Sequence, residues 1–262
     1  MQTNATTGFK DELVKPSPAS RAVSHTDWLI ARKKLLLKEK ELTRLQDEVA
    51  RARAAMPWEK VEKAYTFNSP DGPVTLADLF DGRRQLIVQH FMFGPDDAEG
   101  CPGCSLSADS IDGALPHLEN NDVSVVAVSR APLAKLNAYK KRMGWHFNWV
   151  SSENNDFNYD YNVSWTKADL AKGYITYNYA TIENPSTETE DLPGVSVFYK
   201  DENGDIYHTY STFARGGEFQ AVALRYFEIA PLGRSLAPFD QWIRRHDSYT
   251  TPNTTASCCS SK

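Results

Sequence analysis

The chain has 262 residues, of which 41% are hydrophobic and 24% are charged, a balance typical of a globular protein that can bury a substantial core. Its formal net charge of −5 disfavours nucleic acid and anionic membranes as partners, because both select a basic surface. No apolar run reaches the roughly 20 residues that a membrane-spanning helix needs, and the first residues lack the basic-then-apolar pattern of a secretory signal. We therefore expect a soluble, cytoplasmic protein with no membrane or nucleic-acid partner.

The N-terminal part of the chain differs in pattern from the rest. Residues 1–22 are polar and proline-containing, which predicts a disordered or loosely docked segment. Residues 23–57 predict a long helical arm, capped by Ser24 or Thr26 and ended by Pro57, with apolar residues at helical spacing and interleaved charges. We expect this arm to pack on its own domain or on a second subunit, which would make the protein a homo-oligomer.

Residues 58–249 alternate between strand-like and helix-like segments. A short strand, a Pro-Asp-Gly turn and a short helix precede a buried strand over "QLIVQHFMF". Then follow a helix over "SADSIDGALPHLEN", the apolar strand "VSVVAVS", a helix closed by Gly144, a short strand over "HFNWVSS" and a hairpin turning at Asn203-Gly204. This order predicts an α/β domain with a mixed sheet. The Ser/Thr-rich residues 250–262 predict a flexible tail.

Four cysteines occur as two local pairs, Cys101/Cys104 and Cys258/Cys259. A secreted disulfide-stabilised fold would carry more cysteines in a shorter chain. In a reducing compartment, a single C-x-x-C motif is more often catalytic or metal-binding than structural. For the pair in the polar tail, an incidental role is favoured over a resolving thiol or a palmitoylation site.

The stretch "FGPDDAEGCPGCS", residues 93–105, places the first pair between a buried strand and a helix. Unpaired N–H groups and the dipole at the start of a helix would lower the pKa of Cys101, and Cys104 is close enough along the first turn to form a disulfide with it. The three acidic residues before Cys101 oppose this effect, because negative charge raises the pKa of a thiol. The pattern favours a redox-active dithiol over metal ligands, and both over a structural or vestigial motif.

The segment "VTLADLFDGRRQLIVQHFMFG", followed by "CPGC", resembles the opening of the thioredoxin-like superfamily in its peroxiredoxin-related branch. Five longer segments resemble more closely a thioredoxin-like family named DUF899. They are "FMFGPDDAEGCPGCS", "LPHLENNDVSVVAVSRAPLAKLNAYKKRMGW", "VSSENNDFNYDYNVS", "LPGVSVFYKDENGDIYHTYSTFARG" and "WIRRHDSY". The resemblance runs from about residue 25 to residue 249. It implies a thioredoxin-like α/β fold, with a mixed central sheet flanked by helices, plus the N-terminal helical extension.

The superfamily resemblance also implies roles for individual residues. Cys101 would be the attacking thiol and Cys104 the resolving one, with Pro193 as the candidate for a cis-proline facing the dithiol. His90 aligns with the buried acid that lies beneath the dithiol in thioredoxins. It would be a general base or a metal ligand there, and a hydrogen-bonded core histidine is the equal alternative. His208, on the second strand of the hairpin, could also approach the site.

These features lead to three functional hypotheses. The first is a thiol oxidoreductase that needs no cofactor and acts on a small-molecule thiol, disulfide or oxidant, or on a protein thiol. A peroxiredoxin-type peroxidase is disfavoured, because Ala98 and Gly94 stand where the peroxidatic site carries Thr and Pro. The second is a copper enzyme that oxidises a small thiol, or a copper carrier. The third is a binding scaffold with a vestigial motif. The copper ligands would be Cys101, Cys104, His90 and His208.

The aromatic-rich stretch "RMGWHFNWVSSENNDFNYDYNVSW" is expected mainly to pack in the core. The functional alternative is an aromatic-lined substrate pocket beside the cysteines. Its polar contacts would then be Arg142, Ser151, Ser152 and Asp156.

Overall fold

The computed structural model describes residues 21–249. The expectations for the first 20 residues, and for the tail 250–262 with Cys258 and Cys259, lie outside the described residues. The chain divides between Met56 and Pro57 into two compact units, which are described separately here.

The first unit contains the helix α2 (His25–Ala54), which confirms the predicted helical arm. Its N-terminus is capped by Ser24, whose hydroxyl oxygen accepts a hydrogen bond from the Asp27 N–H at 3.1 Å. None of the residues of α2 is buried, and Trp28 is 52% exposed. The helix is therefore supported by its cap and by local charge pairs such as Arg32–Glu39 at 2.8 Å, while its packing partner stays a prediction.

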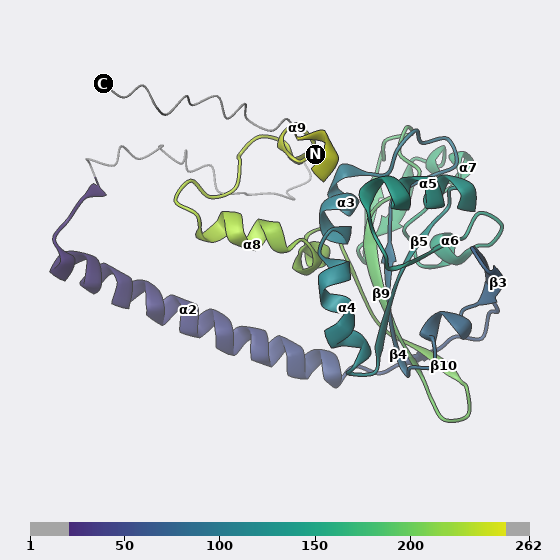
Figure 1. Ribbon diagram of the computed structural model, residues 1–262, viewed down its shortest axis with the longest axis horizontal. Coiled ribbons are helices and arrows are strands. Elements are labelled where there is room, and N and C mark those ends of the chain that lie inside the picture. The colour runs from purple at the N-terminus through teal and green to yellow at the C-terminus, as the bar shows by residue number, and fades with distance from the viewer. Residues whose placement is uncertain (1–20, 250–262) are drawn as a thin grey trace, which may run out of the picture. The chain divides into compact units, whose positions relative to one another are not determined.

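The second unit is built on a mixed sheet (Figure 1). Eight strands of the described residues are hydrogen-bonded in the order β1-β10-β9-β4-β5-β6-β2-β3. They are β1 (Glu59–Lys60), β2 (Thr66–Ser69), β3 (Gly72–Thr75), β4 (Gln85–His90), β5 (Val123–Ser129), β6 (Asn148–Ser151), β9 (Gly194–Lys200) and β10 (Ile206–Phe213). At the centre, β4 runs parallel to β5 and antiparallel to β9. The strands β7 (Tyr174–Tyr177) and β8 (Ala180–Glu183) form a separate hairpin that was not predicted.

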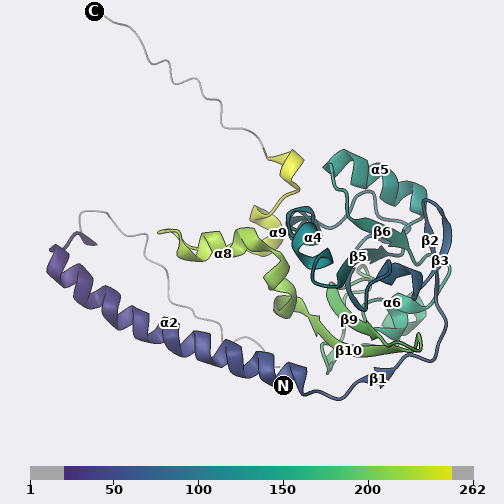
Figure 2. The same cartoon turned by 60° about the horizontal axis from the view of Figure 1, so that its bottom comes forward.

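Helices connect the strands and cover both faces of the sheet. They are α3 (Pro102–Ala108), α4 (Ile111–Glu119), α5 (Leu133–Met143), α6 (Phe157–Asp160), α7 (Lys167–Leu170), α8 (Val222–Ile229) and α9 (Phe239–Trp242), with the 3-10 turns η1 (Asp78–Phe80), η2 (Ala214–Gln220) and η3 (His246–Ser248). Figure 2 shows α4 and α6 on opposite sides of the central strands. The single helix predicted after the cysteines is divided into α3 and α4. The division falls at Asp109, whose carboxylate accepts a hydrogen bond from the Trp145 indole at 2.8 Å.

Two apolar clusters fill the two faces of the sheet. On one face, which we call the α3 face, Phe91 and Trp149 pack with residues of α3, α4 and α5. On the other, the α6 face, Leu86 and Val88 pack with Phe157 and other residues. Successive residues of a strand point to opposite faces, so Leu86 and Val88 of β4 belong to one cluster and Ile87 packs against the other.

The arrangement confirms the predicted fold class. The adjacent strands β10, β9, β4 and β5, with helices α3 and α4 in the crossover from β4 to β5, form the thioredoxin-like core, and the mixed sheet is flanked by helices as expected. The predicted hairpin joins β9 to β10, with Gly204 at φ 86° in its turn. No helix within residues 21–249 is both long and apolar enough to cross a membrane.

Candidate active site

The two cysteines of the C-x-x-C motif lie at the start of α3, just beyond the end of β4. Cys101 is the residue before the helix, and its N–H donates to the Met92 carbonyl at 3.1 Å. Its side chain is partly exposed, whereas Cys104 in the first turn is only 4% exposed. Both are free thiols. The motif therefore places one accessible thiol beside one buried thiol.

The environment separates the acidities of the two thiols. A hydrogen bond from the Cys104 thiol is the main cause that lowers the pKa of Cys101, and burial opposes it. The backbone N–H groups of Cys104 and Gly103 and the positive charge of Arg245 act in the same direction as the hydrogen bond, and the net result is a pKa lowered from 9.0 to about 6. The same hydrogen bond, together with burial, raises the pKa of Cys104 well above 9.0. At neutral pH, Cys101 is therefore mostly a thiolate and Cys104 a protonated thiol.

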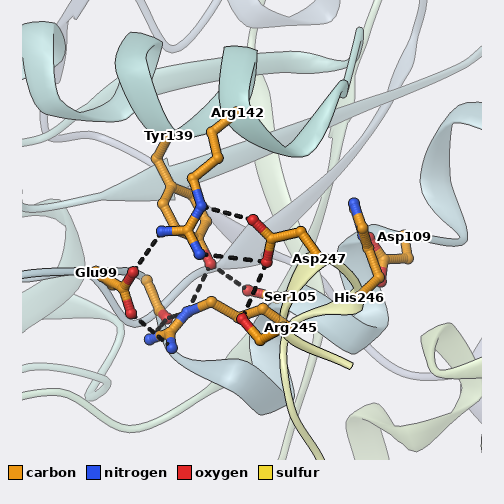
Figure 3. A network of polar contacts seen from close by, with 10 residues as sticks. Glu99, Ser105, Asp109, Tyr139, Arg142, Arg245, His246 and Asp247 are labelled. Carbon is orange, nitrogen blue, oxygen red and sulfur yellow. Dashed lines mark hydrogen bonds and ion pairs between the residues drawn. The ribbon is translucent and has the colours of Figure 1, made fainter. Parts of the chain in front are cut away.

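Arg245 is a cation whose charge helps to lower the pKa of Cys101, and the sequence did not single it out (Figure 3). Its Nε donates to the Gly100 carbonyl and to the Tyr139 hydroxyl, each at 2.9 Å. Its Nη1 pairs with Glu99 at 2.7 Å. Arg245 thus fixes the residue that immediately precedes Cys101. The only sequence signal was the charged segment "WIRRHDSY", which gives no hint of a contact with a residue 145 positions earlier.

A second arginine completes this network. Arg142 pairs with Glu99 and, at 2.6 Å, with Asp247 (Figure 3). Glu99 therefore lies between two arginines. Asp97, also in the acidic stretch, accepts a hydrogen bond from the Gly94 N–H at 2.7 Å. The pKa of Cys101 is lowered despite the acidic stretch. Two of the three carboxylates, those of Glu99 and Asp97, are engaged by arginines and by a backbone donor.

Cys101 lines two cavities of different character. The first, which we call the apolar cavity, has a volume of about 520 Å³ and is also lined by Cys104. Most of its wall is apolar, with Pro193, Val195, Phe213, Ala221, Leu224 and Phe239. The second, the acidic cavity, has a volume of about 540 Å³ and is lined mainly by charged residues. A molecule that reaches the Cys101 sulfur thus meets an apolar surface on one side and a charged one on the other.

Gln89 is the residue of β4 whose side chain faces the cysteines. It is 3% exposed, its Nε2 donates to the Cys104 carbonyl at 3.2 Å, and it lines the apolar cavity. Its Oε1 is buried with no hydrogen-bond partner among the described residues. Sequence reasoning passed over Gln89 in favour of the adjacent histidine, which carries the more familiar chemistry.

The histidine assignments are corrected by the structure. His90 points to the α6 face, where its Nε2 shares a hydrogen bond with the Ser196 hydroxyl at 2.8 Å and its ring stacks on Phe157. Burial lowers the pKa of His90 to about 3, so the ring is neutral. Its side-chain contacts are those of the hydrogen-bonded core histidine of the alternative interpretation, because the pairing of β4 with β9 and β5 directs the ring to the α6 face. His90 also lines the apolar cavity, but among the described residues no contact of its ring with either thiol is made. His208 does not approach the thiols either. It contacts Ser211 at 2.7 Å and lines a different cavity.

The copper ligand set does not come together in this fold. Cys104 is packed on the α3 face, whereas the His90 ring is packed on the α6 face. Within residues 21–249, no group of three or more histidine, cysteine, aspartate or glutamate side chains is arranged to hold a metal ion. The residues proposed for copper therefore do not fit a shared metal site.

Pro193 lines the apolar cavity with both cysteines, but it is not a cis-proline. All peptide bonds of the described residues are trans. The Leu192 N–H donates to the Val163 carbonyl at 2.9 Å, and Asp191 bridges to Ser164, so the chain enters β9 in an extended path. The trans form is the ordinary preference of an X–Pro bond, and the expectation of a cis bond is wrong.

The four residues expected to bind a substrate are not brought together. Ser151 donates to the Ala131 carbonyl at 2.6 Å, and Ser152 bonds to Asn158 at 3.1 Å, both buried in the core. Asp156 pairs with Lys63 at 2.9 Å on the surface, and Arg142 holds the Glu99 network. None of the four lines the apolar or the acidic cavity. The aromatic residues around them pack in the core as expected, with Trp145, Phe147 and Trp149 buried.

Comparison with solved structures finds proteins named as peroxiredoxins. A mutant of peroxiredoxin Q from Xanthomonas campestris is 12% identical and covers 62% of this chain and 89% of its own, with a TM-score of 0.42. Peroxidoxin BcpB of Mycobacterium tuberculosis is 12% identical and covers 64% of this chain and 93% of its own, with a TM-score of 0.43. The mitochondrial 2-Cys peroxiredoxin of Plasmodium falciparum is 16% identical and covers 68% of this chain and 98% of its own, with a TM-score of 0.38.

None of the curated proteins matches the chain. The family described as "Bacterial protein of unknown function (DUF899)" matches residues 17–249. This match covers most of the 262 residues, including both cysteines and the Arg245 segment. The chain therefore belongs to the DUF899 family.

Proposed function

We propose that this protein is a thiol–disulfide oxidoreductase whose nucleophile is Cys101 and whose resolving thiol is Cys104. The observation that carries the proposal is the contrast between the two sulfurs. One is partly exposed with a pKa lowered to about 6, and the other is buried with a raised pKa. A dithiol that reduces a disulfide needs this contrast, because one sulfur must attack while the other waits as a protonated thiol.

The reaction follows from these protonation states. The Cys101 thiolate attacks one sulfur of the substrate disulfide, whose S–S bond breaks, and the other half leaves as a thiolate that takes up a proton from solvent. Cys104 then loses its proton and attacks the Cys101 sulfur, which releases the second half of the substrate as a thiol. The two cysteines are oxidised to a disulfide, and the substrate disulfide is reduced to two thiols. A dithiol reductant returns the protein to its starting state.

The network around Arg245 supports the attacking step. Its contacts with Gly100 and Glu99 hold the chain just before Cys101, and its positive charge stabilises the thiolate. The Cys104 thiol donates a hydrogen bond to Cys101, which stabilises the thiolate and places the two sulfurs next to each other before the disulfide forms. The hydrogen bond from the Gln89 side chain of β4 to the Cys104 carbonyl helps to hold the first turn of α3 against the sheet.

The test compares Cys101→Ser with Cys104→Ser in the reduction of a small disulfide. Cys101→Ser should lose the reaction by about a thousandfold or more, as expected when a nucleophile is removed. Cys104→Ser should still attack and should accumulate a mixed disulfide, visible by mass spectrometry as the added mass of half the substrate. The wild-type protein should instead show a Cys101–Cys104 disulfide after one turnover.

Two outcomes would contradict the proposal. A Cys101→Ser protein with unchanged reduction would mean that the motif is vestigial. Retention of the mixed disulfide by the wild-type protein, with no Cys101–Cys104 bond formed, would mean that Cys104 does not resolve it.

A further inference from the structure

We propose that the apolar cavity beside Cys101 binds the neutral, apolar half of a small-molecule disulfide, and that the site discriminates against anionic disulfides. This inference rests on the proposed function and names its substrate class. Its starting point is that Cys101 and Cys104 both lie in the wall of the apolar cavity. A substrate sulfur that reaches Cys101 from this side therefore brings its substituent into contact with that wall.

The composition of the wall selects an apolar substituent. Val195 and Leu224 are 2% and 1% exposed, so packing holds the base of the wall in place. Phe239, which also lines the cavity, is 42% exposed and presents apolar area that a ligand can cover. Removing such area from water contributes roughly 25 cal/mol per Å². The volume of about 520 Å³ lies within the range of small-molecule sites. An aromatic or branched aliphatic group would fill it.

The charged residues that line the apolar cavity carry more negative than positive charge among the described residues. Arg215 is the cation among the described residues that line it, and its guanidinium pairs with Glu218 at 3.2 Å. Glu218 is also paired with Arg234 at 2.9 Å. Asp240 adds a further negative charge to the lining. An anionic substrate would be desolvated here and would have to compete with Glu218 for Arg215, which is unfavourable.

The opposite side of Cys101 adds repulsion. The acidic cavity is lined by more carboxylates than cations among the described residues. The carboxylates are Asp96, Asp97, Glu99, Glu188, Glu190 and Asp191, and the cations are Arg130, Lys167 and Arg245. Arg130 is paired with Asp191 at 2.8 Å, and Arg245 with Glu99 at 2.7 Å. Both sides of Cys101 therefore disfavour a negatively charged disulfide.

The test compares two disulfides of similar shape. One is 2,2′-dithiodipyridine, which is neutral, and the other is 6,6′-dithiodinicotinic acid, which carries two carboxylates. Each kcat/KM is divided by the rate constant of the same disulfide with a free small thiol, to remove differences in intrinsic reactivity. The normalised kcat/KM should favour the neutral disulfide by at least about tenfold, the scale on which apolar sites discriminate.

A cavity-filling variant tests whether the preference comes from this cavity. A Cβ atom at Gly217, in the cavity wall, would lie near only Val195, at 3.9 Å, so Gly217→Leu can place its side chain in the cavity without a backbone clash. This variant should lose most of the preference, by about fivefold or more in kcat/KM for the neutral disulfide. The rate at which iodoacetamide alkylates Cys101 should remain unchanged. Gly113→Leu is the matched control, because Gly113 lies outside both cavities in α4 and a Cβ there meets nothing within 4 Å.

The outcomes separate the two proposals. If both disulfides are reduced with equal normalised rates, or the anionic one faster, the substrate class is wrong while the oxidoreductase function stands. If Gly217→Leu changes neither rate, the apolar cavity is not the binding site. If neither disulfide is reduced by protein whose Cys101 is alkylated normally, the oxidoreductase function itself is wrong.

Discussion

The two faces of strand β4 carry neighbouring polar residues with opposite roles. On the α3 face, Gln89 contacts the helix that holds the cysteines. Cys101 lines two cavities, and Cys104 lines the apolar one. On the α6 face, His90 begins a hydrogen-bonded chain that runs through Ser196 and Ser211 to His208. Its contacts measure 2.8, 2.8 and 2.7 Å in that order. Two adjacent positions thus belong to separate polar systems, because a strand directs alternate side chains to opposite sides.

The electrostatic difference between the faces explains their separate roles. On the α3 face, hydrogen bonds and a nearby cation lower the pKa of Cys101 and so favour its charged form. On the α6 face, burial lowers the pKa of His90 to about 3 and so favours its neutral form. The α3 face favours a charged thiol, whereas the α6 face favours a neutral, closely packed core. We therefore expect changes on the α3 face to alter reactivity and changes on the α6 face to alter stability.

The largest expected effect is the loss of stability when a buried aromatic side chain is removed from either face. Phe157→Ala, on the α6 face, should lower the free energy of unfolding by about 3–5 kcal/mol, because the ring is fully buried. Phe91→Ala, on the α3 face, should be similarly destabilising and should also change Cys101 alkylation, since the Phe91 ring packs against Gly100. Denaturant unfolding and iodoacetamide kinetics measure the two properties separately.

The matched control for these variants is Tyr226→Ala, because Tyr226 is 68% exposed. It should change stability by less than about 0.5 kcal/mol. If Phe157→Ala folds but its Cys101 is alkylated at an altered rate, the two faces are coupled. The expectation that changes on the α6 face alter only stability would then be wrong.

The next effect concerns the pH dependence of stability on the α6 face. Burial, and to a lesser extent the charge of His208, lower the pKa of His90 from 6.5 to about 3. Below pH 6.5 the unfolded chain binds a proton at this position that the folded chain excludes. Stability from this group is therefore complete above about pH 6.5 and falls as the pH drops toward 3, by up to about 1.4 kcal/mol per pH unit.

The variant His90→Gln should remove this contribution while keeping a group that can hydrogen-bond to Ser196. Denaturant unfolding between pH 5 and 7.5 should show a smaller slope than in the wild-type protein. A residual slope is expected from His208, whose pKa is also lowered by burial. The rate at which iodoacetamide alkylates Cys101 should be unchanged at pH 7, because the His90 ring is packed on the α6 face. An unchanged slope, or a large change in Cys101 alkylation, would contradict the assignment of the His90 ring to the α6 face.

The smallest expected effect is on the pKa of Cys101. Arg245→Gln removes the cation and leaves Glu99 less compensated, so the pKa of Cys101 should rise and the rate of iodoacetamide alkylation at pH 6 should fall several-fold, up to about tenfold. The alkylation rate as a function of pH measures the shift. Arg142→Gln, which removes the other partner of Glu99, should produce a smaller shift. Equal effects of the two variants, or none, would mean that Arg245 only holds the loop in place.

Much of the fold could be predicted from local pattern. The apolar strand before the cysteines, the β-branched strand after them and the Asn-Gly turn of the hairpin each reflect a short-range preference. The division of α3 from α4, and the hairpin of β7 and β8, could not be predicted in the same way. Both are accompanied by contacts between distant segments. Trp145 bonds to Asp109 at the division of the helices, and Tyr177 of the hairpin bonds to the Pro193 carbonyl at 2.7 Å.

The sequence by itself determined that two thiols stand between a buried strand and a helix, because this placement needs only the order of residues along the chain. Only the tertiary structure decided which side chain faces them. The pairing of β4 with β9 and β5 directs Gln89 rather than His90 toward α3, and a shift of one residue would reverse that choice. The tertiary structure also decided the acidity of Cys101. The cation that helps to lower its pKa, Arg245, is contributed by a segment far along the chain, and no local pattern records such a contact.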